Sequence, residues 1–549
     1  MASASDRLPP TLQHVAGRLK ENVLPFDPFP QPPYNAPGAS RQVRSPLAGA
    51  GARCRQGRRR ESEGASKVTE PQPYDIAIIG GGPGGYVAAI RAAQLGARVA
   101  LIEKERVGGM CLNWGCIPTK ALAHQAELYS EMRRAGEFGI QVGGPVSVDF
   151  ARMMARKDEV VQTLVGGVEE LIRAHRIDLF PGVGTILKPN LVRVTPGIYH
   201  PDTQPVEVEA RRLIIATGSL PVPVPIPGHD LPGVVNARGL LDIRTQPRDL
   251  VIIGASVVGV EFASIFSALG TRVTLLGRRT FLKDAEEQLA RRFRPLLARQ
   301  GVRIEIGLEF RQIVQTDDGR LRVEYERAGQ PQSAEADLVL SSTGHAPYTA
   351  ELGLDNIGLA TERGRIPVNE YLETSVPDVY AIGDVTGIYM LAHVASHQGI
   401  VAVRNALGRR EAMDYRAVPN CIYTVPEIAG VGLTERQAKE AGVDFVSSRF
   451  PFSINGRALG MGATEGQVRM ICERLPDGRG GRVLGVHIMG PRASDLIAEA
   501  ALAIQLGATA EDIARTIHQH PTLAEALMEA AMEMGEGAIH YRKVAGREA

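Results

Sequence analysis

Cysteine is scarce in this chain, with five residues among 549. So few cysteines do not form a disulfide framework, and we expect a reducing compartment, the cytoplasm, where a disulfide is more often catalytic than structural. Long apolar runs are also missing, since none approaches the ~18 residues of a membrane span. The N-terminus holds no compact apolar segment with a cleavage site, so we expect no secretory signal.

An excess of either charge is missing too, because 62 Lys and Arg residues face 61 Asp and Glu residues. This balance gives no global argument for nucleic acid or membrane as a partner. By contrast, hydrophobic residues make up 44% of the chain and glycines number 60, which suits a soluble α/β protein with a large core. At about 150 residues per domain, the length predicts roughly three or four domains.

Residues 1–72 differ in composition from the remainder. They contain the stretch PFDPFPQPPYNAPGAS, residues 25–40, and then the arginine-rich RCRQGRRR, residues 53–60. Proline density and the lack of periodicity predict a disordered tail. The alternative is a docking arm for a partner or nucleic acid, but charge runs without structure are usually solvated.

One sequence pattern occurs twice after the tail. Residues 75–105, DIAIIGGGPGGYVAAIRAAQLGARVALIEKE, fit a strand, a glycine-rich turn, a helix and a second strand. Residues 249–279, DLVIIGASVVGVEFASIFSALGTRVTLLGRR, match them without a gap. The repeat is far more specific than one glycine motif and predicts two dinucleotide-binding βαβ units.

The first unit has all three glycines of a dinucleotide loop. Gly80 would make the tight turn, Gly82 would let the backbone approach a pyrophosphate, and Gly85 would allow close packing of helix on strand. The phosphates would then lie at the helix N-terminus, which favours anions. Glu103 ends the next strand, where an acid can bind a ribose hydroxyl. The motif alone does not distinguish FAD from NAD.

The second unit keeps Gly254 and Gly259 but has Ser256 at the middle position, so the approach to a pyrophosphate is expected to be looser. The retained third glycine favours NAD. However, Gly277 stands where an NAD site usually has an acid, and Arg278 follows it, with a second arginine after that. Arginines at this place accommodate a 2′-phosphate, so NAD and NADP both stay open.

The stretch GGMCLNWGCIPTKAL, residues 108–122, places four residues between Cys111 and Cys116. A zinc site would need two more clustered ligands, and Cys421 and Cys472 stand alone. A structural disulfide closing so small a loop would add little stability. A redox pair is favoured, because Cys116 begins an expected helix, where the dipole lowers a thiol pKa.

This stretch resembles the active-site segment of the flavin-dependent pyridine-nucleotide disulfide oxidoreductases, and the similarity extends over about residues 74–543. The resemblance implies FAD and a nicotinamide nucleotide as cofactors, no metal, and a redox-active disulfide between Cys111 and Cys116. It is strongest with the branch that oxidises dihydrolipoamide to lipoamide and passes a hydride to NAD. Trp114 stands where a smaller aliphatic residue is common, and we expect it to fill core; the alternative is that it shapes access to the disulfide.

Other segments extend the resemblance. IIATGS, which contains Gly218, resembles the turn where the chain leaves the flavin domain, and VYAIGDVTG resembles the second FAD motif, so Asp384 would bind the ribityl chain. Gly344 lies in STGHAPYT, which departs from the family at two positions. Lys120 matches the lysine near flavin N5 and Glu261 its carboxylate partner, where a positive charge would stabilise the reduced ring. The alternative for these two residues is a surface ion pair.

The segment TIHQHPTLAEALMEAA, residues 516–531, is the most specific C-terminal signal. It resembles the family motif in which His520 would be the catalytic base and Glu525 its orienting carboxylate. Histidine suits this task because its pKa lies near working pH, and a carboxylate fixes its tautomer. In the family the histidine reaches the disulfide of the partner subunit, so the resemblance implies an obligatory homodimer. We expect His518 to be structural.

These observations predict an α/β protein with two Rossmann-like domains, for FAD and NAD(P), and a C-terminal α+β dimerisation domain. The expected substrate is dihydrolipoamide, carried on the lipoyl domain of a 2-oxoacid dehydrogenase or glycine cleavage complex. The expected domains are the tail (1–72), the FAD-binding domain (73–224 and 346–415), the NAD(P)-binding domain (225–345) and the dimerisation domain (416–549).

Two other functions compete with this one. The first is an NADPH-dependent reductase of another disulfide or of mercuric ion, which the arginine pair at residues 278–279 supports. Mercuric reductases carry a further cysteine pair at the C-terminus, and HYRKVAGREA has none. The second is a docked subunit without activity, which the complete set of cysteine, histidine and glutamate disfavours.

Overall fold

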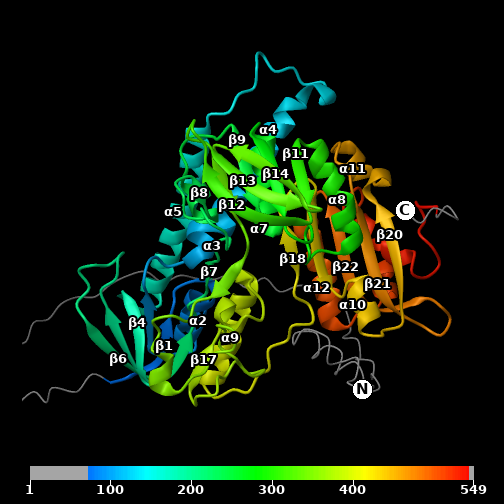
Figure 1. Cartoon of the computed structure of the whole chain (residues 1–549). Coiled ribbons are helices and arrows are strands. Elements are labelled where there is room, and N and C mark those ends of the chain that lie inside the picture. The colour runs from blue at the N-terminus through cyan, green and yellow to red at the C-terminus, as the bar shows by residue number, and fades with distance from the viewer. Residues whose placement is uncertain (1–71, 543–549) are drawn as a thin grey trace, which may run out of the picture.

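The computed structural model describes residues 72–542. The disordered tail expected over residues 1–72 lies outside the described residues apart from Gln72, as does the end of the C-terminal domain beyond residue 542. In Figure 1 the first sheet lies at the lower left, the second at the top and the third at the right.

The first sheet combines parallel strands with an antiparallel hairpin. Its order is β3-β2-β1-β6-β5-β4, and β17 pairs with β6. The strands are β1 (Tyr74–Ile79), β2 (Val99–Glu103), β3 (Asp178–Pro181), β4 (Val183–Lys188), β5 (Leu191–Thr195), β6 (Val206–Ile215) and β17 (Val379–Ala381), and the helices are α2 (Pro83–Gln94), α3 (Gly109–Trp114), α4 (Cys116–Arg133), α5 (Phe150–Ala174) and α9 (Ala392–Ala406).

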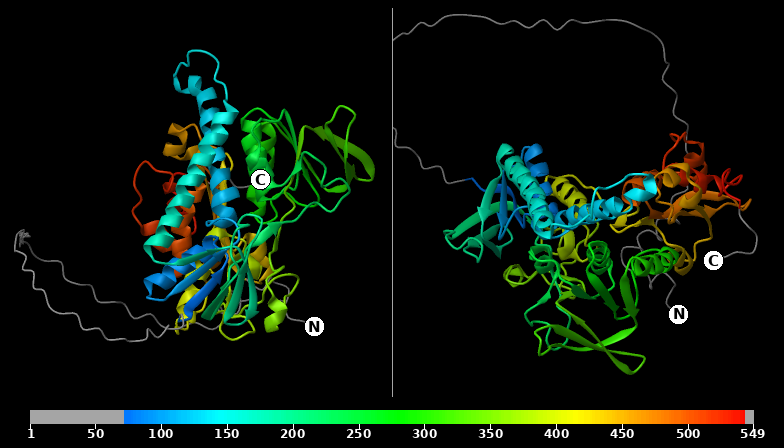
Figure 2. Two further views of the ribbon diagram at one scale, coloured as in Figure 1. Left: turned by 90° about the vertical axis from the view of Figure 1, so that its left-hand side faces the viewer. Right: turned by 90° about the horizontal axis from the view of Figure 1, so that it is seen from above.

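Both faces of the first sheet are buried, which explains the apolar run of β1. Ile76 and Ile78 pack with apolar residues of α2, α5 and α9, whereas Ala77 and Ile79 pack with the β4–β5 hairpin. Alternate side chains of a strand point to opposite faces, so a strand covered on both sides is apolar throughout. Figure 2 shows α4 and α5 side by side.

The second sheet is wholly parallel, in the order β11-β10-β9-β15-β8, and a three-stranded antiparallel sheet, β12-β13-β14, lies beside it. One apolar cluster joins the two sheets. The elements are β8 (Val234–Val235), α6 (Ala237–Asp242), β9 (Asp249–Ile253), α7 (Val257–Ala268), β10 (Arg272–Gly277), α8 (Glu287–Arg299), β11 (Val302–Ile306), β12 (Leu308–Gln315), β13 (Leu321–Arg327), β14 (Gln330–Ala336) and β15 (Leu338–Ser341).

The third sheet is antiparallel throughout, in the order β18-β19-β22-β21-β20, and has its own core with α12, α13 and α14. Its elements are β18 (Asn420–Ile422), β19 (Glu427–Gly432), α10 (Glu435–Glu440), β20 (Phe445–Pro451), α11 (Gly456–Gly460), β21 (Gln467–Arg474), β22 (Gly480–Gly490), α12 (Ala493–Leu506), α13 (Ala510–Arg515) and α14 (Glu525–Met532). Short 3-10 turns lie at Ala135–Phe138, Leu354–Ile357, Gly383–Thr386 and Phe452–Ile454.

Two short strands join the first and second sheets. β7 (Ser219–Pro221) leads the chain out of the first unit, β16 (His345–Pro347) leads it back, and the two pair antiparallel. The expected fold class, two parallel nucleotide-type units followed by an α+β unit, is confirmed. All three sheets fall within the ranges expected for the three domains, and the boundaries themselves stay a prediction.

Within residues 72–542, no helix combines the length and the apolar character that crossing a bilayer demands. The same residues contain no group of three or more His, Cys, Asp or Glu side chains that could hold a metal ion.

Candidate active site

Glycine shapes the first nucleotide loop through close backbone contacts. Gly80 has φ +106°, and a Cβ there would lie 2.3 Å from the carbonyl oxygen of Ala216. A Cβ at Gly85 would lie 1.7 Å from the carbonyl oxygen of Gly80. Gly82 is open, because the nearest atom to a Cβ there is Gly109 Cα at 3.9 Å. These contacts agree with a tight turn at Gly80 and close packing of α2 at Gly85, and Gly82 leaves room for the expected pyrophosphate.

The first loop also has the polar groups that a dinucleotide needs. α2 has Gly82 as its N-cap residue, no capping side chain and no acid in its first turn, so its N–H groups favour an anion. Glu103 Oε2 accepts a hydrogen bond from Gly81 N–H at 2.6 Å, and Oε1 accepts one from Glu105 N–H at 2.7 Å. Burial raises the pKa of Glu103. The loop and the carboxylate fit the phosphates and ribose of FAD.

The second FAD segment approaches the same loop. Asp384, on the turn after β17, accepts a hydrogen bond from Ser219 Oγ at 2.6 Å, and burial raises the pKa of Asp384. Gly218 and Gly344 have φ +74° and +119°, and each stands directly before one of the paired strands β7 and β16. These two glycines turn the chain where it crosses between the units. Binding of the ribityl chain by Asp384 stays a prediction.

The two cysteines flank a sharp turn between α3 and α4. Cys111 lies in α3, and Cys116 is the first residue of α4, so the helix start expected at Cys116 is confirmed. Gly115 makes the turn, because a Cβ there would lie 2.8 Å from the carbonyl oxygen of Met110. Both cysteines are free thiols, so the structure shows the reduced pair, and the disulfide expected between them stays a prediction.

The environment has opposite effects on the two thiols, raising the pKa of Cys111 and lowering that of Cys116. A hydrogen bond from the Cys111 thiol, helped by the charge of Lys120 against the opposing effect of burial, lowers the pKa of Cys116 to about 7. The same hydrogen bond and burial raise the pKa of Cys111. Elsewhere burial raises the pKa of Cys421 and of Cys472 to about 12. Cys116 is thus the more acidic thiol of the two, which fits the redox pair expected from the sequence.

Lys120 and Glu261 form an ion pair at the interface of two units. Lys120 Nζ lies 3.0 Å and 3.2 Å from the two carboxylate oxygens of Glu261, whose side chain is 4% exposed. Glu261 also accepts a hydrogen bond from Tyr423 N–H at 2.9 Å, and the Lys120 ammonium lies 4.6 Å from the centre of the Tyr423 ring. The alternative of a surface ion pair is wrong, because Glu261 is buried.

Replacing Lys120 by Met should raise the pKa of Cys116 by ~1–2 pH units, because a stabilising positive charge disappears. The midpoint of the pH dependence of Cys116 alkylation by iodoacetamide measures this pKa. Glu261→Gln is the matched control with the opposite sign, since the charge of Glu261 raises the pKa of Cys116. An unchanged midpoint in Lys120→Met would contradict this electrostatic account.

The second nucleotide loop repeats the geometry of the first. Gly254 has φ +125°, and a Cβ there would lie 2.3 Å from the carbonyl oxygen of Ser342. A Cβ at Gly259 would lie 2.0 Å from the carbonyl oxygen of Gly254. Ser256 does not cap α7, because its hydroxyl donates to Ser342 O at 3.3 Å instead. The N-terminus of α7 is therefore as free for a pyrophosphate as that of α2.

The end of β10 distinguishes this loop from the first. A Cβ at Gly277 would lie 2.5 Å from Ile306 Cδ1 and 2.9 Å from Ala255 Cβ, so an acid could enter only if both residues moved. Arg278 and Arg279 are exposed, and neither forms a hydrogen bond or ion pair with any described residue. The end of β10 thus offers no carboxylate to a ribose. It carries instead two cations, Arg278 and Arg279, without partners among the described residues.

His520 and Glu525 form a pair at the start of α14. His520 Nδ1 lies 2.8 Å from Glu525 Oε1, and Thr522 N–H donates to Glu525 Oε2 at 2.7 Å. Although burial opposes them, these two bonds hold the pKa of Glu525 below its ordinary value. The carboxylate orients the ring so that Nε2 is left to accept a proton. The imidazole is 79% exposed in the single chain.

His518 has a different setting. Its side chain is 4% exposed, Nδ1 lies 2.8 Å from Thr516 O, and Nε2 lies 2.9 Å from Glu499. Both ring nitrogens are occupied, which agrees with a structural role. Within the described residues, no hydrogen bond or ion pair connects His520 or Glu525 to the cysteine segment.

The cysteine segment lies between the two nucleotide loops. The start of α3 touches the first loop through the contact of Gly109 with Gly82, and α4 bonds to α7 through Lys120 and Glu261. The thiol pair is therefore close to both loops. The fold and the site therefore define a nucleotide-dependent dithiol oxidoreductase.

Sequence patterns place the chain within this class. The pattern of the pyridine nucleotide-disulphide oxidoreductases matches residues 74–399, and the pattern of their dimerisation domain matches residues 418–531. The chain therefore belongs to the pyridine nucleotide-disulphide oxidoreductase family. It uses FAD and a nicotinamide nucleotide, and its C-terminal domain is the dimerisation domain of a homodimer.

Several proteins are similar in sequence to this chain over most of its length. A dihydrolipoyl dehydrogenase of Geobacillus stearothermophilus is 40% identical over 457 residues, which is 83% of this chain and 94% of that protein. The mitochondrial dihydrolipoyl dehydrogenase of Pisum sativum is 41% identical over 85% of this chain and 92% of its own length. A leghemoglobin reductase of Vigna unguiculata is 41% identical over 83% of this chain and 87% of its own length.

Solved structures show the same fold. LpdA of Mycobacterium tuberculosis superposes with a TM-score of 0.77 at 27% identity, covering 84% of this chain and 100% of that one. The HOCl-induced flavoprotein disulfide reductase RclA of Escherichia coli, in complex with Cu(II), gives 0.75 at 29% identity and covers 84% of this chain and 100% of its own.

One expectation about the active-site segment is wrong. Trp114 does not fill core but is half-buried, with the guanidinium of Arg238 4.0 Å from the centre of its ring. The site also includes two residues that no sequence motif revealed. Arg238 and Tyr423 reach it from segments without a signature of their own, whereas Ser219 and Thr522 lie within the segments IIATGS and TIHQHPTLAEALMEAA.

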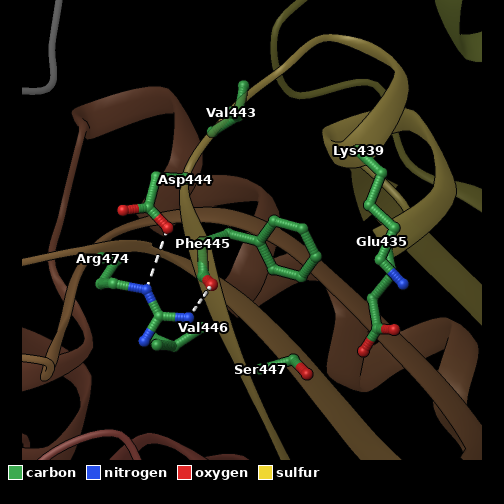
Figure 3. A pocket seen from close by; sticks show the side chains of 8 residues that line it. All are labelled: Glu435, Lys439, Val443, Asp444, Phe445, Val446, Ser447 and Arg474. Carbon is green, nitrogen blue, oxygen red and sulfur yellow. Dashed lines mark hydrogen bonds and ion pairs between the residues drawn. The ribbon is translucent and has the colours of Figure 1, made fainter.

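A surface depression of about 510 Å³ lies far from these residues, in the third unit between α10, β20 and β21 (Figure 3). Arg474 crosses it, donating to Asp444 at 2.9 Å and to Phe445 O at 2.8 Å. The depression contains no residue of the nucleotide loops, the cysteine segment or the histidine pair.

Proposed function

We propose that this chain is a dihydrolipoyl dehydrogenase, which oxidises dihydrolipoamide to lipoamide and passes a hydride to NAD⁺. The observation that carries the proposal is the placement of a low-pKa thiol, Cys116, between two nucleotide loops. The likeness to several dihydrolipoyl dehydrogenases over most of the chain supports it. As in these relatives, the lipoyl dithiol would be the electron donor.

The first step is proton transfer to His520. One thiol of the substrate gives its proton to Nε2 of the His520 of the opposite chain, because Nδ1 is held by Glu525. The thiolate formed attacks Sγ of Cys111, the sulfur–sulfur bond to Cys116 breaks, and Cys116 leaves as a thiolate beside Lys120. The low pKa of Cys116 makes it the better leaving group of the two.

The second step releases the product. The remaining substrate thiol displaces Cys111, and its proton goes to the Cys111 thiolate that leaves. This closes the lipoyl disulfide and leaves two electrons on the cysteine pair. Bound FAD supplies the chemistry that passes these electrons on to the nicotinamide as a hydride. Lys120, fixed by buried Glu261, holds its positive charge beside Cys116 throughout.

The finer assignments belong to the same proposal. The substrate would be the lipoyl domain of a 2-oxoacid dehydrogenase or glycine cleavage complex. The low cysteine content supports a reducing compartment, the cytoplasm. Asp384 would bind the ribityl chain of FAD and Glu103 its ribose. The four site residues of the dithiol chemistry would be Cys111, Cys116, His520 and Glu525.

Substrate comparison tests the proposed direction. We expect dihydrolipoamide oxidation to have a kcat/KM at least ~100-fold above that for NADPH-driven reduction of glutathione disulfide or mercuric ion, a difference of ~3 kcal/mol. The competing function, an NADPH-dependent reductase, predicts the opposite order. Equal or reversed efficiencies would contradict the proposal.

The free arginines after β10 predict use of NADP⁺ beside NAD⁺. No carboxylate opposes a 2′-phosphate, and each arginine can add a charge-assisted hydrogen bond worth ~1.5–3 kcal/mol. Replacing Arg278 and Arg279 together by Gln should therefore lower kcat/KM for NADP⁺ by about 10–100-fold and change that for NAD⁺ less than about twofold. An equal fall for both nucleotides would show that the arginines do not read the 2′-phosphate.

A further inference from the structure

The three side chains of Trp114, Arg238 and Glu105 meet beside the turn that joins the two cysteines. Trp114 is the last residue of α3, directly before Gly115 and Cys116. Arg238 lies at the start of α6, in the second unit, and Glu105 follows β2 in the first. One guanidinium from the second unit therefore joins two nearby positions of the first unit, residues 105 and 114.

The guanidinium is held on two sides. Its nitrogens lie 2.6 Å and 3.2 Å from the two carboxylate oxygens of Glu105, which is the bidentate geometry specific to arginine. Its carbon lies 4.0 Å from the centre of the Trp114 ring, within the range of a cation–π contact. The Glu105 side chain is 10% exposed, so solvent screens this ion pair less than it screens a surface pair.

Glu105 is itself fixed in place. His200 Nε2 lies 2.9 Å from the Glu105 carbonyl oxygen, and the Glu105 N–H donates to Glu103 at 2.7 Å. Because its backbone is bound at both ends, Glu105 is a rigid anchor for Arg238. Arg238 is bound to Glu105 and also contacts the indole of Trp114, so Glu105 restrains the end of α3 through Arg238.

We propose that Arg238 is a positioning residue for the cysteine pair: held by Glu105, it packs on Trp114 and fixes the turn that sets Cys111 against Cys116. The inference rests on the proposed use of these cysteines as the redox pair. The geometry of the turn matters because the hydrogen bond between the two thiols depends on it. A looser α3 would separate the thiols and weaken that bond.

The test uses a readout that fold stability alone would not move. The pH dependence of Cys116 alkylation by iodoacetamide, followed residue by residue by mass spectrometry on the reduced full-length protein, reports the contact between the thiols. The groups that face Cys116 are Cys111 on α3, Lys120 on α4, Glu261 on α7 and the phenol of Tyr423. None of them is changed in the variants.

Arg238→Met keeps an unbranched apolar side chain but removes the planar guanidinium and its charge. Trp114→Leu removes the ring on which the Arg238 guanidinium packs. We expect both to raise the alkylation midpoint of Cys116 by about one pH unit and to lower kcat for dihydrolipoamide oxidation about tenfold. Trp114→Phe keeps an aromatic face, so its alkylation midpoint and its kcat should stay close to the wild-type values. Arg238→Lys should behave like Arg238→Met, because an ammonium lacks the planar fork.

Arg244→Met is the matched control. Arg244 also joins the second unit to the first, through a 2.7 Å ion pair with Asp158 on α5, and its side chain is 61% exposed. The Arg244→Met variant should have the wild-type alkylation midpoint of Cys116 and the wild-type kcat. Thermal unfolding midpoints of all variants exclude global loss of structure as the cause.

Two results would overturn the proposal: wild-type alkylation profiles in both Arg238→Met and Trp114→Leu, or the same shift in Arg244→Met. Alkylation requires no lipoyl substrate, so the proposal is tested apart from the proposed function. If the profiles shift as expected but the wild-type protein does not oxidise dihydrolipoamide, the positioning role stands and the function is wrong.

Discussion

Cys116→Ser should bind FAD normally and lose dihydrolipoamide oxidation by at least about 1,000-fold, because no sulfur remains to carry the electrons from the substrate. The serine is nearly the same size and begins the same helix, so α4 and its ion pair with Glu261 are retained. The measurements are the flavin content of the purified protein and kcat with dihydrolipoamide and NAD⁺. The loss is the largest that we expect from a single substitution.

Cys421→Ser is the control for this variant. Cys421 lies on β18, and burial raises its pKa to about 12, so it stays a thiol at neutral pH. It should keep wild-type activity. Oxidation of the dithiol by Cys116→Ser at more than a few per cent of the wild-type rate would show that the electrons take another route.

Mixed dimers of Cys116→Ser chains and His520→Gln chains should recover activity that neither chain has alone. His520→Gln removes the base and should cost about 10²–10⁴-fold by itself. If each site takes its cysteines from one subunit and His520 from the other, a mixed dimer contains one intact site and one doubly damaged site. Random assembly of equal amounts would then restore about a quarter of the wild-type activity.

The mixed-dimer experiment distinguishes a shared site from a site within one chain. The cysteine segment and the His520–Glu525 pair belong to separate units, and His520 is 79% exposed in the single chain. Differently tagged chains, mixed after reversible dissociation and purified through both tags, give the activity per mixed dimer. No recovery in such dimers would contradict a site shared between subunits.

Much of the fold was predictable because its signals are local. The repeat of residues 75–105 in residues 249–279 predicted both βαβ units, and the structure has β1, α2 and β2 in the first and β9, α7 and β10 in the second. The sheet β12-β13-β14 was not predicted. Its strands mix polar and apolar residues, as in LEFRQIVQ, and only the packing of one face on the second sheet explains them.

The site was predictable to the extent that its residues are neighbours in sequence. Cys111, Cys116 and Lys120 lie within one short segment, whereas Glu261 was assigned to Lys120 only through the resemblance to a family. The contact of Arg238 with Trp114 joins positions that are far apart, and neither residue belongs to a motif that predicts it. Pairings of this kind depend on the final packing of domains.

The most direct test of the central claim is the formation of reduced nicotinamide, followed by its absorbance, when the purified FAD-loaded protein meets dihydrolipoamide and NAD⁺. The account predicts rapid turnover that requires both Cys116 and His520. A yellow, dimeric protein that reduces neither NAD⁺ nor NADP⁺ with this substrate would contradict the proposed function and leave only the family and the fold.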